Sequence, residues 1–211
     1  MSTVRINLKD NIDEAVGIHY SLISSVKNTI DEHDHDFFEI FLVFGGSALH
    51  YVNGASQNLN EGSLVFIRPD DVHFYERDHE ADCQIINIAF SRHDCTKLFE
   101  YLDNPALYEL LMKPKYPVYI ELPHNEMFSF ISKFQKLYTL LHYDKKAIRA
   151  ELKKMIMDLV SCFQYKLGHD EADTIPSWLE SLIYKMQYKE NFTAGLPKML
   201  ELAAKTHEHL C

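Results

Sequence analysis

The residues best suited to chemistry in this 211-residue chain lie between positions 33 and 73. The stretch opens with His33, His35 and Glu39 and closes with His73. Imidazole and carboxylate groups together suit one divalent transition metal, such as Zn, Ni, Fe or Mn, and the sequence does not choose among them. These four side chains are therefore the candidate metal ligands.

Their spacing sets a condition on such a site. Side chains alternate between the two faces of an extended strand, so His33 and His35 share a face. Glu39 has the same parity, but straight strand would separate it from His35 by about 13 Å. Coordination therefore requires a bend at residues 36–38.

Four other side chains are candidates for binding an organic ligand. Arg68 could pair with a phosphate or carboxylate, although an arginine before a proline at a strand end is more often a solvated surface group. Tyr51, Phe66 and Tyr75 could stack on a sugar ring, although aromatic residues in a barrel are more often plain core. Both interpretations of each residue stay open at this point.

The surrounding sequence predicts the β-structure that must position these residues. Strand-like segments lie at residues 18–22, 40–44, 64–67 and 83–90. The Asn53-Gly54 pair favours a type I′ hairpin turn, because both residues accept a positive φ. We expect seven or eight short strands over residues 4–122, with a short helix near 95–101. Strands this short and closely spaced indicate a sandwich or barrel.

The hydrophobic period changes near residue 123. Apolar residues three and four apart predict an amphipathic helix over 125–143 and a second over 148–163, which Gly168 would stop. The short polar connection between them predicts an antiparallel hairpin. Its apolar stripe could pack on the β domain or on another subunit, and we expect a homodimer.

The last segment follows an acidic linker at 169–174. Pro176 and the apolar residues behind it predict a helix. Residues 191–193 are the expected turn after it, with Thr193 as the cap of the next helix. Thr206 is the expected cap of a further helix that has barely begun at Cys211. Helix, turn and capped helix is the pattern with which a helix-turn-helix unit begins. We therefore expect three parts, at residues 1–123, 124–168 and 169–211.

Composition limits the function. The formal net charge of −10 at pH 7 argues against an extended nucleic-acid surface, because phosphate binding needs clustered Lys and Arg. No apolar run approaches the roughly 20 residues of a membrane span, and the N-terminus lacks a signal-peptide core. The four cysteines are widely spaced and are expected to be reduced. We expect a soluble, cytoplasmic protein with no membrane partner.

Taken together, these residues resemble the AraC family of bacterial transcription regulators. The segments similar to its sensor domain, which has a cupin fold, are residues 35–40, Gly45-Gly46 and 62–69, with His73. The segments similar to the opening of its DNA-binding domain are residues 175–179, Asn191-Phe192 and 202–210. Within the family, the regulators of chitobiose-utilisation operons are the most similar type.

The resemblance implies an α+β chain, with an N-terminal cupin-like antiparallel β-barrel or sandwich followed by a helical hairpin and an incomplete helix-turn-helix region. The family's DNA-binding domain carries two helix-turn-helix units, and this sequence ends inside the first. Thr206, His207 and His209 would face DNA in a complete domain. We therefore expect a non-enzymatic sensor and dimerisation part, responding to a sugar or sugar phosphate, that binds DNA only within the complete protein.

The candidate ligand set also resembles that of metal-binding cupins, in which three imidazoles and a carboxylate face the barrel interior. In the AraC family, residues 35–39 are commonly a structural hydrogen-bonded element, which explains His35 and Glu39 without metal but not His33 and His73. The alternative function is therefore a metal-dependent cupin enzyme, such as an isomerase or dioxygenase. The helical C-terminal third distinguishes the two, since an enzyme does not need it.

Overall fold

The computed structural model describes residues 3–77, 82–140, 144–167 and 177–204. The chain divides into two compact units, residues 1–168 and 169–211, which we treat separately.

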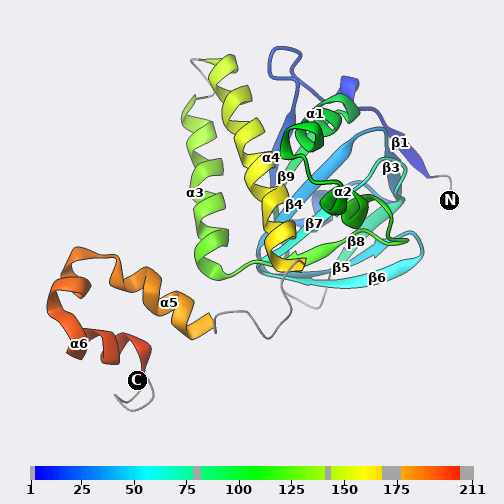
Figure 1. Cartoon of the computed structure of the whole chain (residues 1–211). Coiled ribbons are helices and arrows are strands. Elements are labelled where there is room, and N and C mark those ends of the chain that lie inside the picture. The colour runs from blue at the N-terminus through cyan, green and yellow to red at the C-terminus, as the bar shows by residue number, and fades with distance from the viewer. Residues whose placement is uncertain (1–2, 78–81, 141–143, 168–176, 205–211) are drawn as a thin grey trace. The chain divides into compact units, whose positions relative to one another are not determined.

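Two five-stranded sheets form the body of the first unit (Figure 1). The strands of the first sheet are β1 (Val4–Ile6), β3 (His33–His35), β5 (Ser47–Val52), β6 (Ala55–Asn60) and β8 (His73–Arg77). The strands of the second are β2 (His19–Ile23), β4 (Phe38–Gly45), β7 (Ser63–Ile67), β9 (Gln84–Phe90) and β10 (Tyr119–Glu121). Their orders are β1-β3-β8-β5-β6 and β10-β7-β4-β9-β2. In the described residues β1 and β3 pair in parallel, and the other pairs are antiparallel.

Helices cover the second sheet. The helical elements of the first unit are η1 (Leu8–Asp10), η2 (Val26–Asn28), α1 (Arg92–Leu102), α2 (Pro105–Met112), α3 (His124–Leu140) and α4 (Lys145–Leu167). Figure 1 shows α3 and α4 side by side and antiparallel. The main hydrophobic cluster joins residues of both helices, such as Phe134 and Phe163, to Ile40 and Leu42 of β4. The hairpin stripe therefore packs within the chain, the first of the two alternatives that its sequence left open.

The alternation along β4 separates two cores. Ile40 and Leu42 belong to the cluster under the helices, whereas Phe41 and Val43 belong to a second cluster shared with the first sheet. Both faces of β4 are thus buried, which explains its continuous apolar run. A space between the two sheets, bordered by Ile85 of the second cluster and by Ile23 and Tyr75 packed against it, contains the site described below.

The expected α+β, cupin-like fold is confirmed, with two differences of detail. The predicted hairpin turn is present, with φ of 50° at Asn53 and 80° at Gly54. The described residues form ten strands rather than seven or eight, because strands of three residues, such as β1 and β10, show no period of their own. Helix α2, capped by the Asn104 side chain, was also not predicted.

The second unit contains α5 (Ser177–Met186) and α6 (Lys189–Ala203) in its described part. The predicted turn at 191–193 is wrong, because these residues lie in the first turns of α6, where the Thr193 Oγ1 donates to the Lys189 carbonyl at 2.7 Å. The helical geometry is instead broken at Gly195, with φ of 67°. Residues 169–174 and the expected DNA-facing residues Thr206, His207 and His209 lie outside the described residues. Nowhere in the described ranges is there a helix both long and apolar enough to cross a bilayer.

Candidate functional site

The chain bends sharply between β3 and β4. β3 ends at His35 in one sheet and β4 begins at Phe38 in the other, so the intervening residues cross between the sheets. Asp36 holds the crossing: its Oδ1 accepts from the Leu8 backbone N at 2.8 Å, and its own N donates to the Ile6 carbonyl at 3.2 Å. The bend that coordination requires is therefore present.

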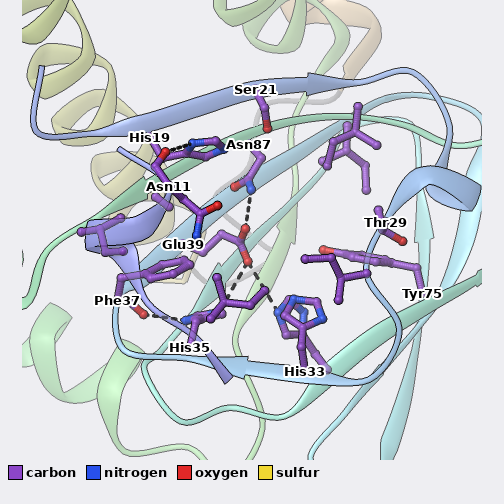
Figure 2. A pocket seen from close by; sticks show the side chains of 17 residues that line it. Asn11, His19, Ser21, Thr29, His33, His35, Phe37, Glu39, Tyr75 and Asn87 are labelled. Carbon is purple, nitrogen blue, oxygen red and sulfur yellow. Dashed lines mark hydrogen bonds and ion pairs between the residues drawn. The ribbon is translucent and has the colours of Figure 1, made fainter. Parts of the chain in front are cut away.

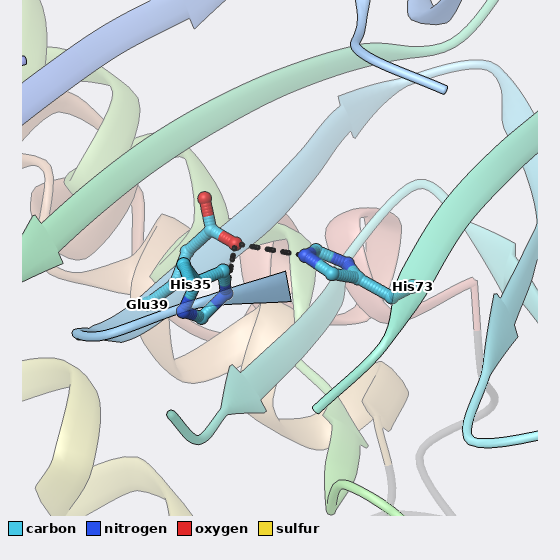
Figure 3. Close-up of side chains that lie close together, drawn as sticks. All are labelled: His35, Glu39 and His73. Carbon is cyan, nitrogen blue, oxygen red and sulfur yellow. Dashed lines mark ion pairs between the residues drawn. The ribbon is translucent and has the colours of Figure 1, made fainter. Parts of the chain in front are cut away.

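Because of this bend, His35 and Glu39 meet His73 of β8 between the sheets (Figure 3). Each imidazole Nε2 lies 3.6 Å from the Glu39 Oε2, and one ligand atom from each residue lies within 4.8 Å of the others. The side chains of the two histidines are 1% exposed and that of Glu39 is 10% exposed. The His35 Nε2, the Glu39 Oε2 and the His73 Nε2 have no hydrogen-bond partner. Buried polar atoms are rarely left unpaired, so this arrangement fits a bound cation or hydrogen-bond donor.

The outward-facing atoms of the same side chains are held by other groups. The His35 Nδ1 donates to the Phe37 carbonyl at 2.8 Å, because a carbonyl can only accept. The Glu39 Oε1 accepts a short hydrogen bond from the Asn87 Nδ2. The His73 Nδ1 lies 3.2 Å from the Nε2 of His50. Such outer contacts orient metal-binding side chains, so the three residues fit the requirements of a metal site.

His33, the fourth predicted ligand, does not belong to the cluster of three. It pairs with His73 across β3 and β8, and the two ring centroids are 4.4 Å apart. Its Nδ1 bonds to the Asp31 carbonyl at 2.8 Å. The structure thus brings together three of the four predicted ligands and places His33 beside them in the cavity wall.

Electrostatics differ among the three clustered residues. Burial disfavours the charged form of each, but the ion pair outweighs it for two of them: Glu39 raises the pKa of His35, and His35 lowers the pKa of Glu39. Burial dominates for His73 and holds its pKa well below the ordinary value. Metal binding requires neutral imidazoles, so it competes with protonation more strongly at His35 than at His73.

The clustered residues line a cavity of about 290 Å³ between the sheets (Figure 2). The other polar side chains in its wall are those of Asn11, His19, Ser21, Thr29, His33, Tyr75 and Asn87. The remaining wall is apolar and includes Ile23, Phe37 and Ile85. No Lys or Arg is among the described residues that line it. This volume is at the lower end of the range for small-molecule sites.

Arg68 is neither a ligand contact nor a solvated group. Its Nε and Nη2 both donate to the Asp71 carboxylate at 2.9 Å. Its Nη1 donates to the Met112 carbonyl at 3.0 Å and, in a short hydrogen bond, to the Pro114 carbonyl. The guanidinium therefore ties the end of β7 to the segment after α2, and both sequence interpretations of Arg68 are corrected.

The three aromatic candidates occupy different places. Tyr75 lines the cavity. Phe66 lies in the main hydrophobic cluster against Phe163, with ring centroids 6.2 Å apart. Tyr51 stacks on Phe74 across β5 and β8 at 4.7 Å, on the face opposite the inward-facing His50. Only Tyr75 is thus placed to touch a guest, and Phe66 and Tyr51 are corrected.

Asn87 and His50 are site residues that sequence reasoning missed. Asn87 is a polar residue inside the apolar strand β9, directly opposite Phe41 in the β4 register. His50 alternates with the buried Ala48 and Val52 in β5, so its parity points inward. Each is a polar residue at a core position, which is the signal that could have identified both.

Comparison with known proteins assigns this region to a domain type. Residues 24–127 match the AraC-like ligand binding domain family. The HTH-type transcriptional activator RhaS of Escherichia fergusonii is 36% identical over 63 residues, covering 30% of this chain and 22% of RhaS. RhaS of Enterobacter sp. (strain 638) is 33% identical over 84 residues, covering 40% of this chain and 28% of RhaS. These matches span about a quarter of each relative's length.

A solved structure extends the likeness in fold. ToxT K231A from Vibrio cholerae strain SCE256 aligns over 92% of this chain and 73% of its own, with a TM-score of 0.53. Its sequence identity is 12%, so this likeness concerns the fold alone.

Proposed function

From the AraC-like ligand binding domain at residues 24–127, we propose that this chain is the ligand-sensing part of an AraC-family transcription regulator. The observation that carries the proposal is the cavity of about 290 Å³ into which unpaired, buried polar atoms point. A guest that fills it would favour one arrangement of the surrounding elements over another. DNA binding would belong to the complete protein.

We propose a small neutral sugar as the guest. The wall combines hydrogen-bonding side chains, including Asn11, Ser21 and Asn87, with apolar residues, as recognition of a sugar's hydroxyl groups and ring faces requires. A sugar phosphate is the weaker alternative, because the described lining residues include no Lys or Arg to meet the phosphate.

We also propose that His35, Glu39 and His73 hold one divalent transition metal. Their donor set of two imidazoles and a carboxylate suits Zn, Ni, Fe or Mn. Such an ion would supply a fixed positive charge to which sugar hydroxyls could bind. His33 would then contribute to the wall rather than to coordination.

A regulator is favoured over a cupin enzyme. RhaS, to which part of this chain is similar, is named as a transcriptional activator. A homodimer remains a prediction, and the hairpin stripe that suggested it is used within the chain.

Binding can be tested on the whole chain by calorimetry with neutral mono- and disaccharides and their phosphates. We expect saturable binding of a neutral sugar. Asn87→Ala should weaken this binding and Tyr51→Ala should leave it unchanged, because Asn87 lines the cavity and Tyr51 does not. Absence of binding by every saccharide, or equal effects of the two variants, would contradict the proposal. In the complete protein, the same sugar should change the affinity for promoter DNA.

The metal can be tested separately by elemental analysis of protein incubated with each ion and freed of excess. We expect about one ion per chain in the natural protein and none in a His35→Ala His73→Ala double variant. Equal metal content in both proteins, or none in either, would rule out this site.

A further inference from the structure

A hydrogen-bonded chain runs from the cavity through the first sheet to the segment before β10. The His73 Nδ1 lies 3.2 Å from the His50 Nε2, and the His50 Nδ1 lies 3.1 Å from the Gln57 Oε1. The Gln57 Nε2 in turn donates to the Pro117 carbonyl at 2.9 Å. His50 and His73 are fully buried, so water does not replace these partners.

The last acceptor fixes the direction of every bond in this chain. A carbonyl can only accept, so the Gln57 amide presents its N–H₂ to Pro117 and its oxygen to His50. The His50 Nδ1 must then carry a hydrogen. His50 is fully buried, and its two ring nitrogens contact the neutral Gln57 amide and the His73 ring rather than a carboxylate, so its ring carries no charge and its Nε2 is an acceptor. The His73 Nδ1 must therefore be the donor.

We propose that His50 and Gln57 are positioning residues that hold His73 in its Nδ1–H tautomer, with the Nε2 lone pair facing the cavity. The consequence for the site is direct. In this tautomer the His73 Nε2 and the Glu39 Oε2, 3.6 Å apart, are both acceptors and need a cation or a donating guest between them. In the opposite tautomer the Nε2–H would donate to Glu39, and the site would satisfy itself.

This arrangement leaves the site open to a cation or a donating guest, so the inference deepens the proposed function. The expected effect of the tautomer on metal or guest affinity rests on that proposed function. The tautomer assignment is independent of it, because the tautomer is a property of the guest-free protein. Neutral histidine in water favours the Nε2–H form, so the Nδ1–H form at His73 requires the partners named here.

The test is long-range ¹H–¹⁵N NMR of histidine-labelled, metal-free protein at pH 7. We expect His73 to be protonated at Nδ1 in the natural chain and to shift toward the Nε2–H form in Gln57→Met, which keeps the side-chain length but neither polar atom. Asn58→Leu, at the exposed neighbouring position of β6, is the matched control and should leave the tautomer unchanged. His50→Phe provides a second variant in which His73 loses the acceptor directly.

A second readout is the Zn²⁺ dissociation constant, which we expect Gln57→Met to raise by about 10- to 100-fold and Asn58→Leu to leave unchanged. An Nε2–H tautomer at His73 in the natural chain, or one unaffected by both Gln57→Met and His50→Phe, would overturn the inference. A natural chain that shows the Nδ1–H tautomer but binds no Zn²⁺ would contradict the proposed metal site and support the tautomer assignment.

Discussion

The Nε2 of His35 and the Oε2 of Glu39 lie 3.6 Å apart, although the two residues belong to different sheets. In a straight strand they would be about 13 Å apart. The crossing at residues 36–37 therefore builds the site, and the Asp36 side chain secures it by accepting from the Leu8 backbone N at 2.8 Å.

Asp36→Ala should accordingly lower the free energy of unfolding by about 1–2 kcal/mol, because it leaves the Leu8 N–H without its partner. Asp34→Ala, on the other side of His35, removes a half-exposed ion pair with Arg5 and should cost less than about 1 kcal/mol. Urea denaturation of both variants measures the difference. Equal losses would show that the Asp36 contact is not what secures the crossing.

The buried Arg68–Asp71 pair should matter for stability rather than for ligand binding. Arg68→Met leaves the buried Asp71 carboxylate without its cationic partner and should cost about 3–5 kcal/mol. Arg92→Met removes an exposed pair with Asp70 and should cost less than about 1 kcal/mol. Thermal and urea unfolding report both values. A small loss from Arg68→Met would mean that water reaches Asp71.

Two glycines with similar backbone angles allow a clash to be separated from strain. Gly46 and Gly54 have φ of 75° and 80°, so alanine is strained at either by about 1–2 kcal/mol. A Cβ at Gly46 would lie 1.8 Å from the Asp82 carbonyl oxygen, whereas one at Gly54 meets nothing within 4 Å. Gly46→Ala should therefore destabilise the fold several kcal/mol more than Gly54→Ala. Equal urea midpoints for the two variants would refute this packing.

Filling the cavity should abolish binding without unfolding the protein. Ser21 lines the cavity, and its neighbour Leu22 in β2 is 42% exposed. Ser21→Phe should therefore remove the heat of saccharide binding, and Leu22→Phe should retain it. Circular dichroism of both variants checks that the sheets are intact. Undiminished binding by folded Ser21→Phe would place the sugar elsewhere.

The cysteine thiols should differ in reactivity. Cys83 and Cys95 are buried, and burial raises the pKa of each to about 12, so almost no thiolate forms at pH 8. Ellman's reagent should modify both only as fast as the fold opens. In urea above the unfolding midpoint they should react at the rate of free cysteine. Fast modification of a Cys83-only variant in buffer would contradict its burial.

Much of the fold could be predicted from the sequence because it rests on local patterns. The Asn53-Gly54 turn, the change of period near residue 123 and the two apolar stripes are each read within one element. The same patterns predicted seven or eight strands where the described residues form ten, since a three-residue strand such as β1 or β10 is defined by its partners and not by its own period.

For the site, the sequence by itself determined the chemical types and the need for a bend at residues 36–38. Only the tertiary structure decided that His35, Glu39 and His73 converge, with His33 outside their cluster. It also decided that Arg68 forms an ion pair with Asp71 and that Tyr51 stacks on Phe74 outside the cavity. The physical reason is that convergence depends on strands paired across two sheets. Which atoms of His73 are bound and which are free depends likewise on His50 and Gln57, from strands far from it in the chain.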